Sequence, residues 1–317
     1  MKRRDFLHKT SHAAAVSGVL SHLPFSLQKN LGLKNLIENA IETDHVLVLI
    51  FLNGGNDGLN TVVPLNYMAE LNTLRSSVVL PENQLLSLDG ADNIGLHPAL
   101  DYYRDMYNEG KLQIIQNVGY SDPNFSHFRS TDIWLSGSDS DEIINSGWAG
   151  RYLDFEYPGY PMDYPNVEVP YPLAIEQGYG SSMLFQGPSA NMGMVVRDPE
   201  NFYRLIGNNP EPGPATNAGD KLDHVRLIQV QSQEYGQVVK EASENISTQG
   251  NYPQSQLAEE LKIVARLIAG GLGTRLYMVQ LGGFDTHDSQ VDPGNRVQGQ
   301  HADLLRTLNE ATKAFMQ

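Results

Sequence analysis

Residues 45–53 form an unbroken apolar run, His-Val-Leu-Val-Leu-Ile-Phe-Leu-Asn, which ends in Gly54-Gly55. A short run that is apolar on both faces and contains several β-branched residues is typical of a strand buried in a parallel sheet. Parallel strands need crossover connections, which are usually helices. The run therefore predicts an α/β fold in which this strand is buried on both faces.

Strand and helix patterns alternate along the rest of the chain. His97-Pro98 opens an amphipathic helix that stops at Gly110, residues 111–118 follow as a second strand, and Asn124 or Ser126 caps a helix that runs through Trp134 to Gly137. In the second half we expect two amphipathic helices, one with an apolar face formed by Val225, Ile228, Tyr235, Val239 and Ala242 and one with an apolar face formed by Leu257, Leu261, Val264 and Ile268. We also expect a buried strand over 275–281 and a helix over 301–317. This alternation predicts a mostly parallel sheet flanked by helices.

Residues 155–215 interrupt that alternation. They are rich in Pro, Tyr, Asn and Gly and have little periodicity. We interpret them as a long irregular insertion, a lid or surface excursion, and not as a separate domain.

The N-terminus has the pattern of an export signal. Arg3-Arg4 precedes Phe6-Leu7, and a mild apolar stretch follows at 13–20. An arginine pair before a weak apolar segment is typical of twin-arginine signals, which export folded proteins, although a basic, frayed terminus is the alternative. We expect a signal over 1–28, a linker over 29–44 and the folded domain over 45–317, with the twin-arginine translocase as a partner and a periplasmic or otherwise exported location. No other apolar run approaches the ~20 residues of a membrane helix.

The charge and the residue composition exclude some classes of partner and some kinds of site. Residues 1–28 hold four of the 22 basic residues and one of the 37 acidic ones, so the remainder has a formal charge of about −18, against −15 for the whole chain. Such a charge disfavours nucleic acid and anionic lipid as partners. The chain has no cysteine, which excludes disulfides, thiolate metal ligands and a cysteine nucleophile. Any metal must be bound through carboxylate, imidazole, amide or hydroxyl groups.

Polar residues follow the first strand directly, in Asn53-Gly54-Gly55-Asn56-Asp57-Gly58. Ligands bind beyond the carboxyl ends of parallel strands, so Asn56 and Asp57 are candidate site residues. An ordinary Gly/Asn/Asp turn is the alternative. A dinucleotide loop is less favoured, because the sequence Gly-x-Gly-x-x-Gly is not present here.

A second candidate pair follows the strand over 275–281, in Gly282-Gly283-Phe284-Asp285-Thr286-His287-Asp288. In an extended backbone, Asp285 and His287 face the same side. A carboxylate and an imidazole on one side can share a divalent cation, or they can form a hydrogen-bonded pair without metal. The carboxyl ends of parallel strands share one edge of the sheet, so this pair could converge with Asp57.

The third candidate is Ser126-His127-Phe128-Arg129-Ser130, at the start of a helix. A hydroxyl among free helix N–H groups suits an anion or a developing alkoxide, and Arg129 could clamp a phosphate or sulfate. Ser126 could instead be an ordinary N-cap. A Ser126–His127 dyad is not favoured, because adjacent helical residues seldom face each other. His97 is either a further site group or a structural helix opener.

These motifs, in this order, resemble the bacterial exported family known as domain of unknown function 1501. The resemblance rests on residues 52–60, 96–100, 126–130 and 282–288, and on Ser-Gly-Trp-Ala-Gly-Arg-Tyr-Leu at 146–153, and it covers roughly 45–317. That family is grouped with the alkaline phosphatase and sulfatase superfamily, so the resemblance implies a parallel-sheet α/β fold with metals at the strand ends.

Carried over by position, the superfamily pattern makes Asp57, Asn56, Asp285 and His287 metal ligands and Ser126 the nucleophile. The Cys/Ser-x-Pro-x-Arg core of sulfatases is not matched, and Asp285 and His287 lie closer in sequence than the phosphatase pair. The superfamily continues with an Asp-His pair that this chain does not reach, which implies that the C-terminal strands are missing. We therefore expect an exported hydrolase of phosphate or sulfate esters that uses a divalent metal, zinc or calcium, or a fragment of one. The alternative is a non-catalytic exported binding or assembly protein that retains the fold.

Overall fold

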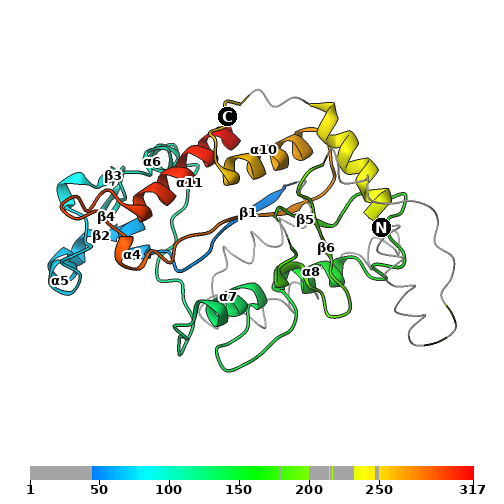
Figure 1. Ribbon diagram of the computed structural model, residues 1–317, viewed down its shortest axis with the longest axis horizontal. Coiled ribbons are helices and arrows are strands. Elements are labelled where there is room, and N and C mark those ends of the chain that lie inside the picture. The colour runs from blue at the N-terminus through cyan, green and yellow to red at the C-terminus, as the bar shows by residue number, and fades with distance from the viewer. Residues whose placement is uncertain (1–44, 179, 200–213, 215, 217–231, 247–249) are drawn as a thin grey trace, which may run out of the picture.

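The computed structural model describes residues 45–317 apart from 179, 200–213, 215, 217–231 and 247–249 (Figure 1). The expected signal and linker lie outside the described residues, as does the first part of the helix expected through Val225. Among the described residues, no helix combines the length and the apolar character needed to cross a membrane.

The strands form two sheets. The parallel sheet contains β1 (Leu47–Leu52), β7 (Leu276–Leu281), β5 (Ala174–Glu176) and β6 (Gly193–Val195), in that spatial order. The antiparallel sheet contains β2 (Val62–Pro64), β4 (Ala91–Leu96) and β3 (Leu86–Leu88), in that order. The helices are α4 (Gly58–Thr61), α5 (Met68–Leu74), α6 (Asp101–Asn108), α7 (His127–Ser136), α8 (Trp148–Glu156), α10 (Gln256–Ala269) and α11 (Gln300–Met316). Short 3-10 helices are η1 (Leu65–Tyr67), η2 (Glu82–Gln84), η3 (Met183–Phe185) and η5 (His287–Ser289).

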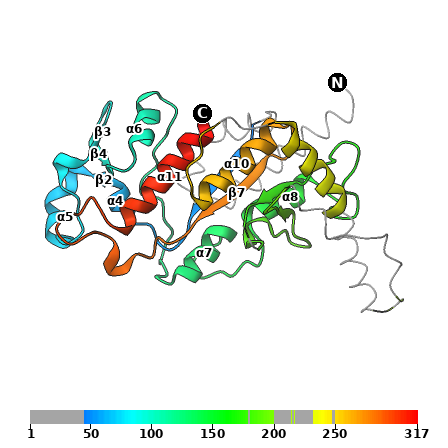
Figure 2. The ribbon, with the colours of Figure 1, turned by 45° about the horizontal axis from the view of Figure 1, so that its top comes forward.

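Helices cover both faces of the parallel sheet, which confirms the predicted α/β class. On one face, α10, α11 and the helical residues 232–245 pack around Tyr277 and Val279 of β7. On the other face, α7, α8 and η3 pack around Met278. Figures 1 and 2 show α10 and α11 on one side of the sheet and α7 and α8 on the other. Neighbouring β7 residues alternate between the two cores, which explains why both faces of this strand are apolar.

Strand β1 is parallel as predicted, but the prediction that it is buried is wrong. It is the outermost strand of the described sheet and pairs on one side with β7. Its residues are therefore only partly covered, and Leu47 is 45% exposed. Both faces of the strand nevertheless pack against helices, since Phe51 stacks on Trp134 of α7 and Ile50 packs on the opposite core. This packing on both faces explains why the run is apolar throughout.

Two local predictions need correction. The helix after His97-Pro98 begins only at Asp101, because residues 97–100 form a turn in which the Leu100 N–H donates to the His97 carbonyl. Residues 111–118 are not a strand. The Lys111 N–H belongs to the ending of α6, since it donates to the Met106 carbonyl, and Asn117 has a φ of 58°, which interrupts an extended backbone at the far end.

The segment 155–215 is not wholly an irregular excursion. It contributes β5 and β6, half of the strands of the parallel sheet, and Ala174 and Ile175 are fully buried. Each of these strands is three residues long. Strands this short leave no periodicity for sequence inspection to detect.

A two-glycine turn links the ends of β1 and β7. Asn53 continues the pairing, since its N–H donates to Leu281 (2.9 Å) and its carbonyl accepts from Phe284 (3.2 Å). Gly54 and Gly55 then adopt φ angles of 111° and 83°. A Cβ at Gly54 would lie 2.7 Å from the Asp285 backbone nitrogen, and one at Gly55 would lie 2.7 Å from the His127 ring. Glycine is required here for both conformation and space.

We predict that Gly54→Ala lowers the free energy of unfolding by about 2 kcal/mol or more, because alanine is strained at this φ and its methyl group would collide with the backbone. The matched control is Gly58→Ala in α4, where a Cβ meets nothing within 4 Å. Urea unfolding followed by circular dichroism measures both. Equal stability of the two variants would contradict the prediction.

Candidate functional site

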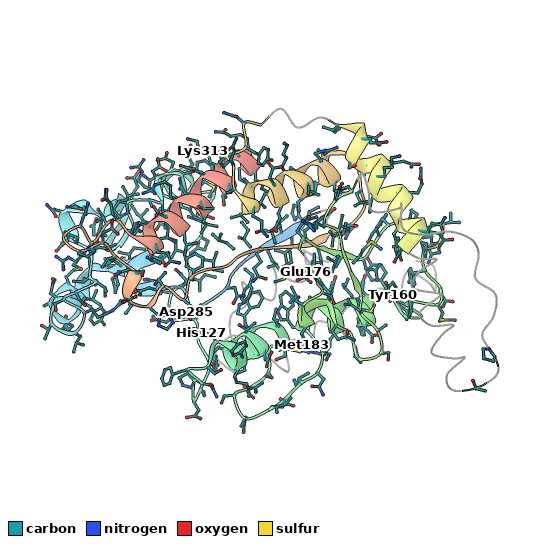
Figure 3. All side chains as sticks on the ribbon, in the orientation of Figure 1. His127, Tyr160, Glu176, Met183, Asp285 and Lys313 are labelled. Atoms are coloured by element: carbon teal, nitrogen blue, oxygen red, sulfur yellow. The ribbon has the colours of Figure 1, made fainter. Side chains whose placement is uncertain are left out.

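Two distant segments of the chain bring three polar side chains together beyond the ends of β1 and β7. The Asp285 Oδ1 atom lies 3.2 Å from His127 Nε2 and 3.0 Å from His287 Nε2. We call His127, Asp285 and His287 the His–Asp–His cluster. Figure 3 shows His127 and Asp285 close together beside α7, away from Glu176. All three side chains are accessible, with exposed fractions of 46–76%.

Turn geometry brings Asp285 and His287 together. The expectation of an extended backbone is wrong, because His287 has a φ of 45° and begins η5. The turn nevertheless directs the His287 ring back to Asp285. Both of the alternatives for this pair, a metal site and a pair without metal, require such proximity.

His127 reaches the cluster because it is the first residue of α7, and because Gly55 leaves room for its ring. Its Nε2 atom faces Asp285, which agrees with the expectation that His127 does not form a dyad with Ser126. From the sequence, we weighed His127 only as a possible partner of Ser126. Nothing in the local pattern indicated a contact with a residue so far along the chain.

Ser126 occupies the N-cap position of α7 but does not cap the helix with its side chain. Its backbone is extended (φ −75°, ψ 124°), and its hydroxyl makes no capping hydrogen bond. Its N–H donates to Asn124 Oδ1 at 2.8 Å. The hydroxyl is exposed at the positive end of a ten-residue helix, where anions are favoured.

Arg129 holds the loop that follows α7. Its Nη2 group donates to the carbonyls of Asp139 (3.3 Å), Ser140 (3.2 Å) and Glu142 (2.5 Å). Three carbonyl partners on one nitrogen anchor the guanidinium to the chain itself. Its role as an anion clamp stays a prediction.

Asn56 and Asp57 belong to a second polar cluster, which shares no hydrogen-bonding or ionic partner with Asp285 among the described residues. The Asp57 Oδ2 atom accepts from Arg75 Nη2 and from Gln290 Nε2 (2.5 Å). The Asn56 Oδ1 atom accepts from His301 Nε2 (2.9 Å) and Thr61 Oγ1 (3.1 Å). Both strand ends carry polar groups, as expected, but their side chains form two neighbouring clusters and not one.

The charge on Asp57 is stabilised internally. Burial raises the pKa of Asp57, but hydrogen bonds from Arg75 and Gln290 and the charges of Arg75 and His301 outweigh burial, so the pKa lies below its ordinary value of 3.8. Arg75 and Gln290 both donate to the Oδ2 atom, so a cation at Asp57 would bind through Oδ1 or replace one of these partners.

Within the described part of the chain, no group of three or more histidine and acidic side chains is arranged as a metal site. In the His–Asp–His cluster, both imidazole Nε2 atoms face the carboxylate oxygen itself. The donor set of two imidazole nitrogens and one carboxylate nevertheless matches three-ligand zinc sites that leave a position open. Because all three side chains are accessible, they can turn toward a cation without unpacking the core.

His97 is a buried structural residue beside the second cluster. It is 1% exposed, its Nδ1 atom accepts from the Ala99 N–H at 3.0 Å, and its ring meets the edge of His301 at 5.8 Å. Burial, and then the charges of His301 and Arg306, lower the pKa of His97 to about 4. Burial also lowers the pKa of His301, although Asp57 opposes the shift. With a pKa of about 4, the His97 ring is neutral in the folded protein at pH 7.

Sequence inspection missed several polar groups around the strand ends. These are Arg75, Gln290, His301 and the buried Glu176, which ends β5 and accepts from the Ser182 N–H at 2.8 Å. Burial raises the pKa of Glu176. None of them lies in a distinctive motif, so only the fold identifies them.

We predict that stability falls as the pH drops from about 6.5 to 4, because the unfolded chain binds a proton that folded His97 excludes. The loss reaches about 3 kcal/mol below pH 4. His97→Asn keeps an acceptor for Ala99 but cannot titrate, so its unfolding free energy should depend less on pH. Urea unfolding across this range measures the difference between the two proteins, with the exposed His45→Asn as control. Parallel curves for wild type and His97→Asn would contradict the assignment.

Comparison of the chain with protein-family profiles, with curated proteins and with solved structures gives no match. The geometry of the two clusters and the motifs that form them are therefore what indicate the function of this protein.

Proposed function

We propose that the protein is an exported, metal-dependent hydrolase of small phosphate or sulfate esters, with an alkaline phosphatase-like fold. The observation that carries this proposal is the approach of His127 and His287 to one oxygen of Asp285, at 3.2 and 3.0 Å. Residues from the β7 loop and from the start of α7 thus supply nitrogen and oxygen donors, and Ser126 precedes one of these residues, His127, in the chain. The export route, through the twin-arginine translocase to the periplasm, is proposed from the N-terminal motif alone.

The His–Asp–His cluster would hold the metal. Two imidazoles favour zinc over calcium, which prefers oxygen ligands. A divalent cation there would polarise an ester oxygen and lower the pKa of a nearby hydroxyl or water. Asn56 and Asp57 lie on the adjacent loop, and their part as further ligands belongs to the proposal. Asp57 would bind the cation through Oδ1, since Arg75 and Gln290 both donate to Oδ2, or would release one of these partners.

Ser126 would be the nucleophile. Its hydroxyl would lose its proton to solvent, its Oγ atom would bond to the phosphorus or sulfur while the bond to the leaving oxygen breaks, and the departing alkoxide would take a proton from solvent. Water would then cleave the ester on Ser126 and release phosphate or sulfate. The free N–H groups of the first turn of α7 would orient the non-bridging oxygens. The absence of a capping bond leaves the Ser126 hydroxyl free for this role.

A second candidate is a non-catalytic exported binding or assembly protein that retains the fold. It is favoured because two predicted site residues already bind other groups of the chain. Asp57 is bound by Arg75 and Gln290, and Arg129 is bound by three backbone carbonyls. Such contacts suit side chains that hold loops together.

We predict that the full chain binds Zn²⁺ and that His127→Asn or His287→Asn weakens binding roughly tenfold or more, since each removes one ligand. Isothermal titration calorimetry measures the dissociation constant, and His45→Asn, an exposed histidine outside the cluster, is the control. Zinc binding that both cluster variants leave unchanged would overturn the metal assignment.

We predict that the zinc-loaded protein hydrolyses nitrophenyl phosphate or nitrophenyl sulfate, and that Ser126→Ala lowers kcat by about 10³-fold or more. The control is Ser121→Ala, an exposed serine in the preceding loop. Turnover that survives in Ser126→Ala would exclude this nucleophile. No turnover of either ester by the wild-type protein would reject the hydrolase and favour the binding protein.

A further inference from the structure

We propose that Asn124 is a positioning residue for Ser126. It fixes the backbone of Ser126 in an orientation in which the hydroxyl does not cap α7 and stays available to react. The inference deepens the proposed function and rests on it for the role of the Ser126 hydroxyl. Its basis is the backbone angle at Ser126 and the hydrogen bonds that Asn124 makes on both sides of it.

The backbone at Ser126 differs from that of serines that cap helices in this protein. Ser255 (φ −143°, ψ 154°) accepts from the Ala258 N–H in α10, and Ser182 (φ −82°, ψ 169°) accepts from the Leu184 N–H in η3. Ser126 also occupies an N-cap position, but its ψ of 124° is 30° below that of Ser255, and its hydroxyl makes no capping bond. The ψ angle sets the direction of the helix N–H groups relative to the serine side chain. The smaller angle therefore separates the hydroxyl from the groups that it would ordinarily cap.

Asn124 makes a hydrogen bond to the backbone of Ser126. The Asn124 Oδ1 atom accepts from the Ser126 N–H at 2.8 Å. A side-chain bond to the N–H two residues along closes a local turn, which is a common role of asparagine. This bond fixes the chain on the N-terminal side of Ser126.

A second bond from Asn124 reaches the helix on the other side of Ser126. The Ser130 Oγ atom in the second turn of α7 donates to the Asn124 carbonyl at 2.6 Å. The Tyr120 hydroxyl lies 3.0 Å from Ser130 Oγ and accepts from the Asn124 N–H at 3.3 Å. Because these bonds join the residues before Ser126 to those after it, its φ and ψ angles cannot change freely without breaking one of them.

The consequence for the proposed reaction is that two sets of groups stay free at once. A capping serine uses an oxygen lone pair and occupies a first-turn N–H group. At Ser126 the hydroxyl is free to attack, and the N–H groups are free to hold the non-bridging oxygens. Fixing a nucleophile in advance accelerates the chemical step more than it strengthens substrate binding.

The test measures kcat and KM of the zinc-loaded full chain with nitrophenyl phosphate or nitrophenyl sulfate, whichever the protein hydrolyses. We expect Asn124→Ala to lower kcat roughly tenfold or more and to change KM less than about twofold, because the ester still binds but its nucleophile is no longer fixed. Asn124→Asp keeps an acceptor for the Ser126 N–H and should retain most of kcat, while its negative charge raises KM for an anionic ester.

The matched control is Asn166→Ala. The Asn166 Oδ1 atom accepts from the Glu168 and Val169 N–H groups at 3.0 and 2.9 Å, which is the same kind of turn in another exposed loop. A kcat in Asn124→Ala that is no lower than in Asn166→Ala would overturn the proposal. An equal loss of kcat in Asn124→Ala and Asn124→Asp would also overturn it, because the acceptor would then not matter.

Amide exchange separates this proposal from the proposed function, since it requires neither metal nor turnover. In Asn124→Ala the released Ser126 hydroxyl should cap α7, so NMR of the metal-free chain should show exchange of the Phe128 or Arg129 N–H slowed about fivefold. If no ester is hydrolysed but this slowing is seen, the hydrolase is rejected and the positioning role of Asn124 stands. Unchanged exchange overturns that role. Slowing that persists in Asn124→Ala/Ser126→Ala also overturns it, because Ser126 would then not be the capping group.

Discussion

The left-handed backbone at Gly54 and Gly55 is the constraint on which the site depends. At these two residues the chain leaves β1 and passes the Asp285 backbone, which leaves no space for a Cβ at Gly54, and then the His127 ring, which a Cβ at Gly55 would displace. Three segments can therefore meet at one point: the end of β1, the loop after β7 and the start of α7. A side chain in this turn would separate the β7 loop from α7, and with it the donors of the His–Asp–His cluster.

The two polar clusters differ in how their charges are satisfied. Asp57 is part-buried, accepts from a guanidinium and an amide, and has a lowered pKa. Asp285 is nearly half exposed and faces two imidazoles that are themselves exposed. Removing a partner from a buried carboxylate is costly, whereas rearranging exposed groups costs little. The first cluster is therefore suited to fixing the loop after β1, and the second is free to bind a ligand.

Sequence patterns predicted the elements with strong local signals. The apolar runs of β1 and β7 and the striped helices α10 and α11 were confirmed, and α7 begins beside Ser126 as expected. β5 and β6 have three residues each and carry no such signal. The candidate site was likewise predicted only where its residues are close in sequence. The sequence predicted that Asp285 and His287 lie close together, but from an extended backbone where the structure has a turn, and the contact of His127 with Asp285 depends on tertiary packing. The pairing of Gln290 with Asp57 spans 233 residues, and no local pattern encodes it.

The order of strands in the sheet also has a consequence for synthesis of the chain. β7 lies between β1 and β5, and Leu276 pairs with both Leu47 and Ala174. The strand that joins the sheet is therefore the last of its strands to leave the ribosome. At about 5–20 residues per second, the apolar β1 waits roughly 10–45 s for its partner. During that interval the backbone amides and apolar side chains of β1 lack the strand that pairs with them in the described sheet, so β1 is exposed to non-native pairing until β7 is made.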